Sequence, residues 1–410
     1  MKKLFALLLS LAMVLALVAC GQKDPTPDTP DTPDDPQTKV EYKVAMITDY
    51  GDITDQSFNQ TTYEACKAFA EDNSIEFSYF KPAGDNTADR VAMIEKAVDE
   101  GFNVIVMPGY AFGGAIVEAA PEFPDVKFIA LDVAAGDLLE TAVAKAGEAY
   151  DYTPENWDLN KYVDMSNVYC AVYQEELCGY MAGYAAVKLG YKNLGFLGGM
   201  SVPAVVRYGY GFVQGVDAAA ADMGLTDVKV NYIYGDQFFG DADITAVMDT
   251  WYQGGTEVVF ACGGGIYTSA VDAAKKVGAK VIGVDVDQAG VIAKYAGVDG
   301  MTVTSAMKGL YPATYDTLTD VIVNGNWDKY VGKIATLGLV SGTDPEANYV
   351  QIPMGDGTQW SDSFTQDDYK AMVKDMFDGK ITVSNNTSSD VSAASFATVI
   401  TVDDQGSIKG

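Results

Sequence analysis

Short apolar runs alternate with longer amphipathic stretches along the chain from Tyr42 onward. The apolar runs predict strands at 43–48, 75–80, 103–107, 126–131, 167–172, 193–199, 228–234, 256–263 and 279–285. The stretches between them predict helices at 59–73, 87–100, 175–189, 204–223, 242–253 and 266–277. In 87–100, for example, Val91, Ile94 and Val98 recur at helical spacing. This alternation indicates an α/β protein, and about nine strands in two runs indicate two doubly wound parallel sheets.

The first 41 residues follow a different pattern. Lys2 and Lys3 precede an apolar run that ends in "LVAC", and Gly21 follows Cys20. This resembles an export signal with a bacterial lipobox, and it predicts a lipid on Cys20 and a location on the outer face of the cell membrane. A transmembrane anchor is the alternative, but the apolar run is short for one. Residues 21–41 repeat Pro, Asp and Thr and predict an extended tether.

Composition narrows the possible functions. The chain has 410 residues, a net charge of −30 and no histidine. Nucleic acids are therefore poor partners, and histidine-based catalysis and most zinc sites are excluded. We expect no cofactor or metal. Besides Cys20 there are four cysteines. Cys66, Cys170 and Cys262 are predicted to be core residues, and a Cys170–Cys178 pair remains open.

Polar residues and glycines recur where predicted strands end. In open α/β sheets the ligand lies outside the carboxyl ends of the strands. Each such residue taken alone is more often a turn or a helix cap. Their recurrence in both halves of the chain nevertheless predicts a ligand site. The candidates are Asp49, Asp55, Phe58 and Asn59 after the first strand, then Asp132, Gly264, Asp285 and Asp287 after later ones.

Several motifs have competing interpretations. "GYGFVQG" (209–215) departs from the dinucleotide fingerprint and lies inside a predicted helix, and "GGGIYTS" (263–269) lacks the lysine of a P-loop. Phe58 and either Phe238 or Phe239 fit a sandwich around a flat ring, and packing against their own helices is equally consistent. Lys308 near a helix start needs an anionic or hydroxyl partner, such as Asp285 or a ligand oxygen, unless it is simply exposed.

Taken in order, several motifs resemble one family. They are "DQSFNQ" (55–60), "EELCGYMAGYAA" (175–186), "GFLGGMSVPAVVRYGYGFVQG" (195–215), "VIGVDVDQ" (281–288) and "TSAMKG" (304–309). Over roughly residues 43–355 the chain resembles the basic membrane proteins, or purine nucleoside receptor A-like lipoproteins. These are substrate-binding proteins of ABC transporters.

The resemblance implies a type I periplasmic-binding-protein fold with two lobes joined by a three-stranded hinge. The lobes would be 42–172 with 305–330, and 173–304 with 331–400. It implies a purine nucleoside between them, an ABC permease as partner, and no enzymatic activity. Carried over onto this sequence, Phe58 stacks on the base together with Phe238, which we favour over Phe239. The base also contacts Asn59, Asp49 and Asp55, and the ribose contacts Lys308 and Asp285, with Asp287 a weaker candidate.

Two segments depart from the family pattern, and other functions remain open. Residues 133–166 are longer than is typical, and we expect them to change the edge of the cleft. The tail after about 355 matches weakly, although 368–383 reads as a helix and a terminal strand. The alternatives are a receptor for a sugar or an autoinducer, an enzyme acting on nucleosides through Asp49 and Asp55, or a surface adhesin.

Overall fold

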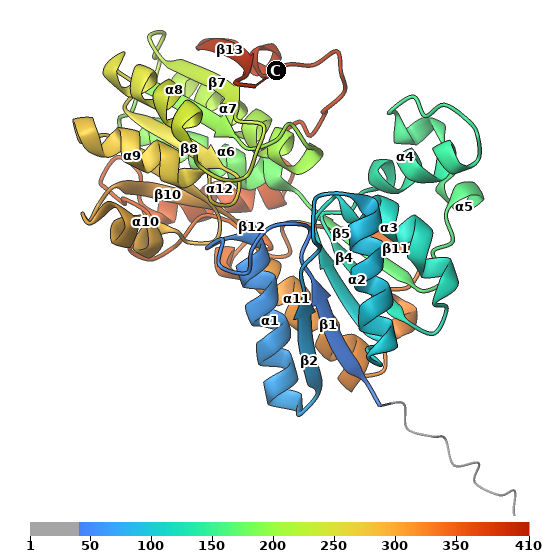
Figure 1. The fold of residues 1–410 in the computed structure, drawn as a ribbon. Helices are drawn as coiled ribbons and strands as arrows, with labels where there is room; N and C mark the ends of the chain where they lie inside the picture. The colour runs from blue at the N-terminus through green and yellow to red at the C-terminus, as the bar shows by residue number, and fades with distance from the viewer. Residues whose placement is uncertain (1–40, 410) are drawn as a thin grey trace, which may run out of the picture. The chain divides into compact units, whose positions relative to one another are not determined.

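The computed structural model describes residues 41–409, which form two parallel β-sheets with helices on their faces (Figure 1). The predicted export signal, Cys20 with its predicted lipid, and residues 21–40 of the predicted tether lie outside the described residues. The α/β fold with two doubly wound lobes is confirmed. The nine strands predicted between residues 43 and 285 and the six helices predicted between 59 and 277 are all present, with ends that differ from the prediction by at most two residues.

The first sheet has six parallel strands. Their order is β11 (Lys333–Leu337), β5 (Val168–Tyr173), β4 (Lys127–Leu131), β3 (Val104–Pro108), β1 (Lys43–Ile47) and β2 (Glu76–Phe80). The associated helices are α1 (Phe58–Asn73), α2 (Thr87–Asp99), α3 (Phe112–Ala119), α4 (Ala135–Lys145), α5 (Leu159–Tyr162) and α11 (Leu310–Leu318). Every residue of β3 is buried, as expected for a central strand covered on both faces.

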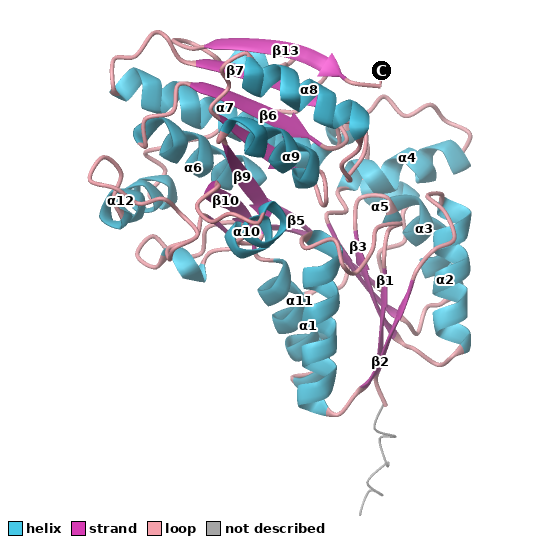
Figure 2. Cartoon of the chain, turned by 60° about the vertical axis from the view of Figure 1, so that its left-hand side comes forward, coloured by secondary structure: helices cyan, strands magenta, loops and turns pink. Residues whose placement is uncertain are grey.

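The second sheet has seven strands, all parallel except β12, which pairs antiparallel with β10. Figure 2 shows β13, β7, β6, β9 and β10 of this sheet among its helices. Their order is β12 (Val350–Gln351), β10 (Thr302–Lys308), β9 (Lys280–Asp285), β8 (Val258–Cys262), β6 (Asn193–Gly198), β7 (Lys229–Tyr234) and β13 (Thr401–Ser407). The associated helices are α6 (Glu175–Lys188), α7 (Pro203–Asp222), α8 (Ala242–Gln253), α9 (Tyr267–Val277), α10 (Ala289–Ala296) and α12 (Gln366–Phe377).

The chain passes between the two sheets three times. It runs from β5 into α6, which packs on α7 and β10; from β10 into α11, which packs on α1; and from β11 into β12. These three passages form the hinge. The exact division into lobes stays a prediction: the strand pairing places β11 in the first sheet, although 331–400 was assigned to the second lobe. The pairing of β10 with β9 and β12 likewise places all of β10, up to its last residue Lys308, in the second sheet, although residues 305–330 are predicted to belong to the first lobe.

The terminal strand lies later than the sequence indicates. The helix in 368–383 is present as α12, but residues 381–383 form no strand, so that expectation is wrong. The terminal strand is β13, which pairs with β7 at the edge of the second sheet. Its sequence, "TVDDQGS", is mostly exposed and therefore carries no apolar run.

Glycines bring helices α6 and α7 into backbone contact. A Cβ atom on Gly211 would collide with the carbonyl oxygen of Glu176, and one on Gly215 with that of Tyr180. Gly179 and Gly183 on α6 meet α7 in the same way. The glycines of "GYGFVQG" therefore serve helix packing, in agreement with the rejection of a dinucleotide site.

Replacing Gly215 by Ala should lower the free energy of unfolding by about 1–3 kcal/mol or more, because α6 and α7 must move apart to admit the methyl group. Urea denaturation measures this change. Gly290→Ala is the matched control, since Gly290 lies in α10 with no atom within 4 Å of an added Cβ. It should be neutral or slightly stabilising. Equal effects of the two changes would contradict the packing argument.

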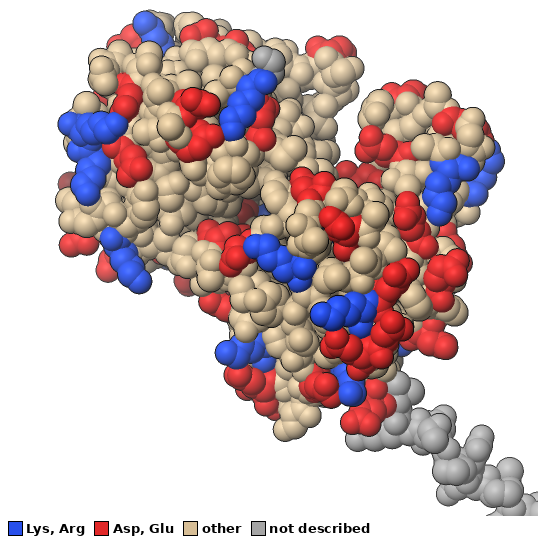
Figure 3. Space-filling model, viewed as in Figure 1, with Lys and Arg blue, Asp and Glu red and all other residues tan. Residues whose placement is uncertain are grey.

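The cysteines and the surface agree with the compositional analysis. Cys66, Cys170, Cys178 and Cys262 are all buried and free, so Cys170 and Cys178 do not form a pair. On the face shown in Figure 3, acidic side chains are spread widely with basic ones interspersed. This distribution is consistent with the net charge of −30 and unlike the basic surface that a nucleic acid requires.

Candidate functional site

A cavity of about 440 Å³ lies at the carboxyl ends of strands from both sheets. It is lined by segments that follow β1, β3, β4, β7 and β8, and by the last residues of β9 and β10. Nine of the candidate ligand contacts predicted from the sequence line this one cavity: Asp49, Asp55, Phe58, Asn59, Asp132, Phe238, Gly264, Asp285 and Lys308. Asp287, the weaker candidate, is exposed and is not part of the lining. The structure therefore brings the nine lining candidates together, and their individual roles stay predictions.

The three acids of the loop after β1 have different environments. Asp49 is buried and accepts hydrogen bonds from the backbone N–H groups of Tyr50 (2.7 Å) and Gly51 (2.8 Å). Burial raises the pKa of Asp49, against the lowering effect of these bonds. Asp52 is exposed and pairs with Lys81 at 3.0 Å.

Asp55 organises the start of α1. Its carboxylate accepts backbone N–H groups from Ser57 (2.9 Å), Asn59 (2.9 Å) and Gln60 (3.1 Å), donors that an α-helix leaves unpaired at its N-terminus. Burial raises the pKa of this carboxyl group, and the three bonds oppose the rise. Asp55 thereby fixes the direction in which Phe58 and Asn59 leave the helix.

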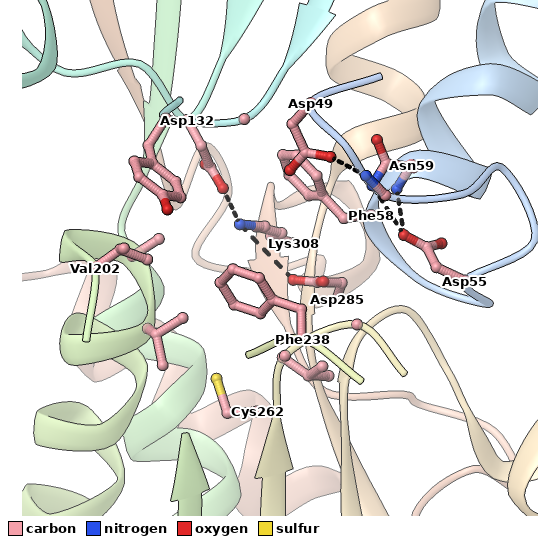
Figure 4. A pocket seen from close by; sticks show the side chains of 18 of the residues that line it. Asp49, Asp55, Phe58, Asn59, Asp132, Val202, Phe238, Cys262, Asp285 and Lys308 are labelled. Carbon is pink, nitrogen blue, oxygen red and sulfur yellow. Dashed lines mark hydrogen bonds and ion pairs between the residues drawn. The ribbon is translucent and has the colours of Figure 1, made fainter. Parts of the chain in front are cut away.

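Asn59 connects Asp49 with Asp55 (Figure 4). Its Nδ2 donates to Asp55 at 3.1 Å and also bonds to Asp49. Its Oδ1 is buried and has no hydrogen-bond partner among residues 41–409. A buried acceptor without a partner is costly unless a ligand donates to it.

Lys308 lies at the centre of a cluster of carboxylates. Its Nζ forms an ion pair with Asp132 and lies 3.5 Å from Glu175 and 3.7 Å from Asp285 (Figure 4). The same atom lies 4.7 Å from the centre of the Phe58 ring. Burial alone would lower the pKa of Lys308, but the three carboxylates outweigh it and raise that pKa, so the ammonium stays charged. The anionic partner that the sequence analysis expects for Lys308 is therefore supplied by carboxylates of the protein itself.

Asp285 links the two sheets. Its carboxylate accepts hydrogen bonds from the hydroxyl groups of Ser57 (2.6 Å), which precedes α1, and Tyr208 (3.2 Å), which lies on α7. Asp285 and Asp132 both have left-handed backbone conformations, with φ of 63° and 59°. Asp tolerates this conformation better than most residues, and such backbones cluster at functional sites.

Phe238 and Phe239 have different surroundings. The Phe238 ring packs against Gly199 and Gly263, where a Cβ would come too close to the ring. Gly264, with φ of 49°, lies against the Phe238 carbonyl. Phe239 is 56% exposed. Phe238 thus has a fixed position in the wall of the cavity, and the choice between the two rings stays a prediction.

Comparison with known proteins supplies the family. A family model described as "ABC transporter substrate-binding protein PnrA-like" matches residues 42–345. The chain belongs to this family. The resemblance seen in the sequence motifs is thereby confirmed, and the protein is a substrate-binding protein of an ABC transporter.

Relatives of this family member come from several organisms. The "ABC transporter nucleoside-binding protein BmpA" of Lactococcus lactis is 25% identical and covers 92% of this chain and 96% of its own. "Basic membrane protein B" of Borreliella burgdorferi is 26% identical, covering 76% and 83%. An "uncharacterized lipoprotein" of Pyrococcus abyssi is 25% identical, covering 74% and 69%.

Solved structures share the fold of this family member. A solute-binding protein of an ABC transporter from Aeropyrum pernix superposes with a TM-score of 0.63 at 19% identity, covering 85% of this chain and 95% of its own. One from Conexibacter woesei gives 0.58 at 19% identity, covering 84% and 99%. Between residues 41 and 409, no helix combines the length and the apolarity that crossing a membrane requires.

Sequence reasoning missed four polar residues of this PnrA-like site. Glu175 is fully buried, contacts Lys308 and accepts a hydrogen bond from Arg207 Nε at 2.7 Å. Arg207 and Asp137 line the cavity, and Ser57 bonds to Asp285. Glu175 follows the predicted strand at 167–172 closely and carries the same strand-end signal as Asp132. Arg207 and Asp137 lie within helices, where sequence gives no such signal.

Glu176, next to this cluster, should make stability depend on pH. Burial raises the pKa of Glu176 from 4.5 to about 7, and its Oε2 atom has no partner within the described chain. The folded protein therefore binds more protons than the unfolded chain between these values. Stability falls as pH rises through that interval and levels off above about 7.

Glu176→Gln should therefore stabilise the protein at pH 8 by at most about 3 kcal/mol and change its stability little at pH 4. Urea denaturation at both pH values measures this difference. Glu95→Gln, at an exposed position, is the control and should stay within about 0.5 kcal/mol at both. A Glu176→Gln variant with the wild-type pH dependence would show that Glu176 is not the group responsible.

Proposed function

We propose that this protein is a lipid-anchored receptor that binds a purine nucleoside outside the cell membrane and delivers it to an ABC permease. The observation that carries the proposal is the composition of this cavity. Phe58 and Phe238 are among the aromatic residues that line it, together with hydrogen-bonding groups suited to a base and a charged cluster suited to a ribose. A sugar needs no second aromatic face, and a purine benefits from both.

The base would lie between Phe58 and Phe238. Asn59 offers its unpaired buried Oδ1 as an acceptor, and Asp49 and Asp55 offer carboxylate oxygens. The N–H groups of a purine base are donors that fit these acceptors. The ribose hydroxyls would donate to Asp285 and accept from Lys308, which lies 3.7 Å away from that carboxylate. Asp132 and Gly264 would complete the wall.

The anchoring part of the proposal depends on the sequence and on relatives. The "LVAC" segment with Cys20 carries the signal, and some relatives in the family are named lipoproteins. Cys20→Ala should abolish incorporation of labelled fatty acid and release the protein into the medium. Retention of the label in this variant would overturn the assignment of Cys20.

Titration calorimetry with adenosine, guanosine, inosine, ribose and xylose tests the ligand class. We expect heat of binding with at least one purine nucleoside and none with the pentoses. A pentose-only response would favour the sugar receptor, and no heat with any nucleoside would overturn the proposal. Incubation with inosine should leave it intact, and free hypoxanthine in the mixture would instead indicate an enzyme.

A further inference from the structure

One wall of the cavity contains a cation and a carboxylate that the proposed nucleoside contacts leave unused. Arg207 lies near the start of α7, beside the second sheet, and Asp137 lies in the first turn of α4, beside the first sheet. Both line the same cavity. Asp137 belongs to the 133–166 segment that departs from the family pattern, whereas Arg207 lies within the family-like motif at 195–215.

Arg207 has hydrogen-bond donors to spare. Its Nε donates to the fully buried Glu175 at 2.7 Å, and its side chain is only 14% exposed. Within residues 41–409 its two terminal amino groups make no hydrogen bond. A guanidinium group carries five N–H donors, so four remain for a ligand or water in the cavity. The bond to Glu175 fixes the orientation of the group.

Asp137 supplies an acceptor from the other lobe. One oxygen, Oδ2, accepts the backbone N–H of Ala134 at 2.7 Å, which holds the carboxyl group in place. Burial raises the pKa of Asp137 to about 7, opposed by this bond and by the charge of Arg207. Among the described residues, Asp137 and Arg207 form no ion pair within 4.0 Å, so a gap separates them. A small polar group of the ligand fits between a donor and an acceptor held apart in this way.

The position of Arg207 relative to the other contacts indicates which end of the ligand it meets. Phe58 contacts Lys308, Lys308 lies 3.5 Å from Glu175, and Glu175 bonds to Arg207. In this series of contacts, which begins at the ring proposed to stack on the base, Arg207 lies beyond Lys308, a residue assigned to the ribose. Val172, Val202 and Val205 also line the cavity, and Arg207 and Asp137 add a cation and a carboxylate to its lining.

We propose that Arg207 and Asp137 form a subsite for the 5′-hydroxyl group of the nucleoside and select nucleosides over nucleotides. The subsite rests on the function proposed above. Arg207 donates to the hydroxyl oxygen and Asp137 accepts its hydrogen. A 5′-phosphate is disfavoured because four carboxylates, those of Asp132, Asp137, Glu175 and Asp285, already outnumber the two cations, Lys308 and Arg207.

Calorimetry with inosine, 5′-deoxyinosine and inosine 5′-monophosphate tests the subsite. Wild type should bind 5′-deoxyinosine about tenfold more weakly than inosine. Without the 5′-hydroxyl group, the donor on Arg207 and the acceptor on Asp137 have no ligand partner. Arg207→Met should bind the two with equal affinity. Asp137→Asn keeps an acceptor for the Ala134 N–H and should improve binding of the monophosphate relative to inosine by about tenfold.

Lys192→Met is the control for removing a positive charge, since Lys192 is exposed and pairs with Asp227 away from the cavity. It should keep the tenfold preference for inosine. Circular dichroism checks the fold of each variant, and Asp137→Asn tests the subsite even if Arg207→Met fails to fold.

Some results would overturn the subsite alone, and another would overturn the proposed function. Equal binding of inosine and 5′-deoxyinosine by wild type, or a tenfold preference kept by Arg207→Met, would overturn the subsite and leave the nucleoside receptor standing. So would an Asp137→Asn variant with unchanged discrimination against the monophosphate. Failure of wild type to bind any nucleoside would overturn the proposed function itself.

Discussion

Asp285→Asn should weaken nucleoside binding by at least about 30-fold. Asp285 is buried, and its carboxylate is held by the hydroxyl groups of Ser57 and Tyr208 and lies 3.7 Å from the Lys308 ammonium. A hydrogen bond to a charged group contributes about 1.5–3 kcal/mol, and each 1.4 kcal/mol is a tenfold change in affinity. The substitution removes the charge and turns one acceptor atom into a donor.

Asn is the informative replacement at this position. Asp285 has a left-handed backbone, which Asn tolerates and Ala does not, so the change tests the carboxylate and not the backbone. Asp287→Asn is the matched control: Asp287 lies two residues away, is exposed and accepts a hydrogen bond from the Ala289 N–H. It should bind like wild type. A loss of affinity in the control as large as that in Asp285→Asn would move the ribose contact to Asp287.

Lys308→Met should lower the free energy of unfolding by about 3–5 kcal/mol, the cost typical of breaking a buried ion pair by removing one partner. The Lys308 side chain is 4% exposed, and the change leaves Asp132 and Asp285 without their cation and Glu175 with Arg207 alone. Buried carboxylates without a counter-ion are strongly unfavourable. Urea denaturation at pH 7 measures the effect.

A second substitution tests this explanation. Asp132→Asn in the Lys308→Met background removes one of the stranded charges and should recover part of the lost stability. Lys276→Met is the control, because Lys276 is exposed and pairs with Asp249 at the surface, where such pairs contribute about 0–1 kcal/mol. If Lys308→Met is no more destabilising than Lys276→Met, the cluster is not held together by charge.

Lys308 also joins the two sheets at the cavity. It ends β10 in the second sheet and pairs with Asp132, which follows β4 in the first sheet. Ser57 and Asp285 make a second bond between groups of the two sheets. Both pairs lie where the proposed ribose would bind, so ligand binding and the contact between lobes share the same charged groups. This arrangement fits a hinge that closes on its ligand.

The sequence alone determined strands β1 to β9, the helices α1, α2 and α6 to α9, and the sheet edge at which the site lies. Parallel strands buried on both faces require continuous apolar runs such as 103–107, and the loops after them must be polar, so both signals are local. The edge strand β13 was not predictable, because one exposed side removes the need for apolar residues. Its strand state comes from pairing with β7.

The tertiary structure alone decided which charges meet. Arg207 and Asp137 have no local pattern that marks them as site residues, and together with Glu175 they come from elements far apart in the sequence. Their partners are set by the three passages of the chain between the sheets, which bring the ends of β4, β5, β9 and β10 to one place. The spacing of apolar residues shows only which face of its own helix or strand a residue occupies. The electrostatics of a buried cluster depends on distances between elements, and only the folded chain fixes those.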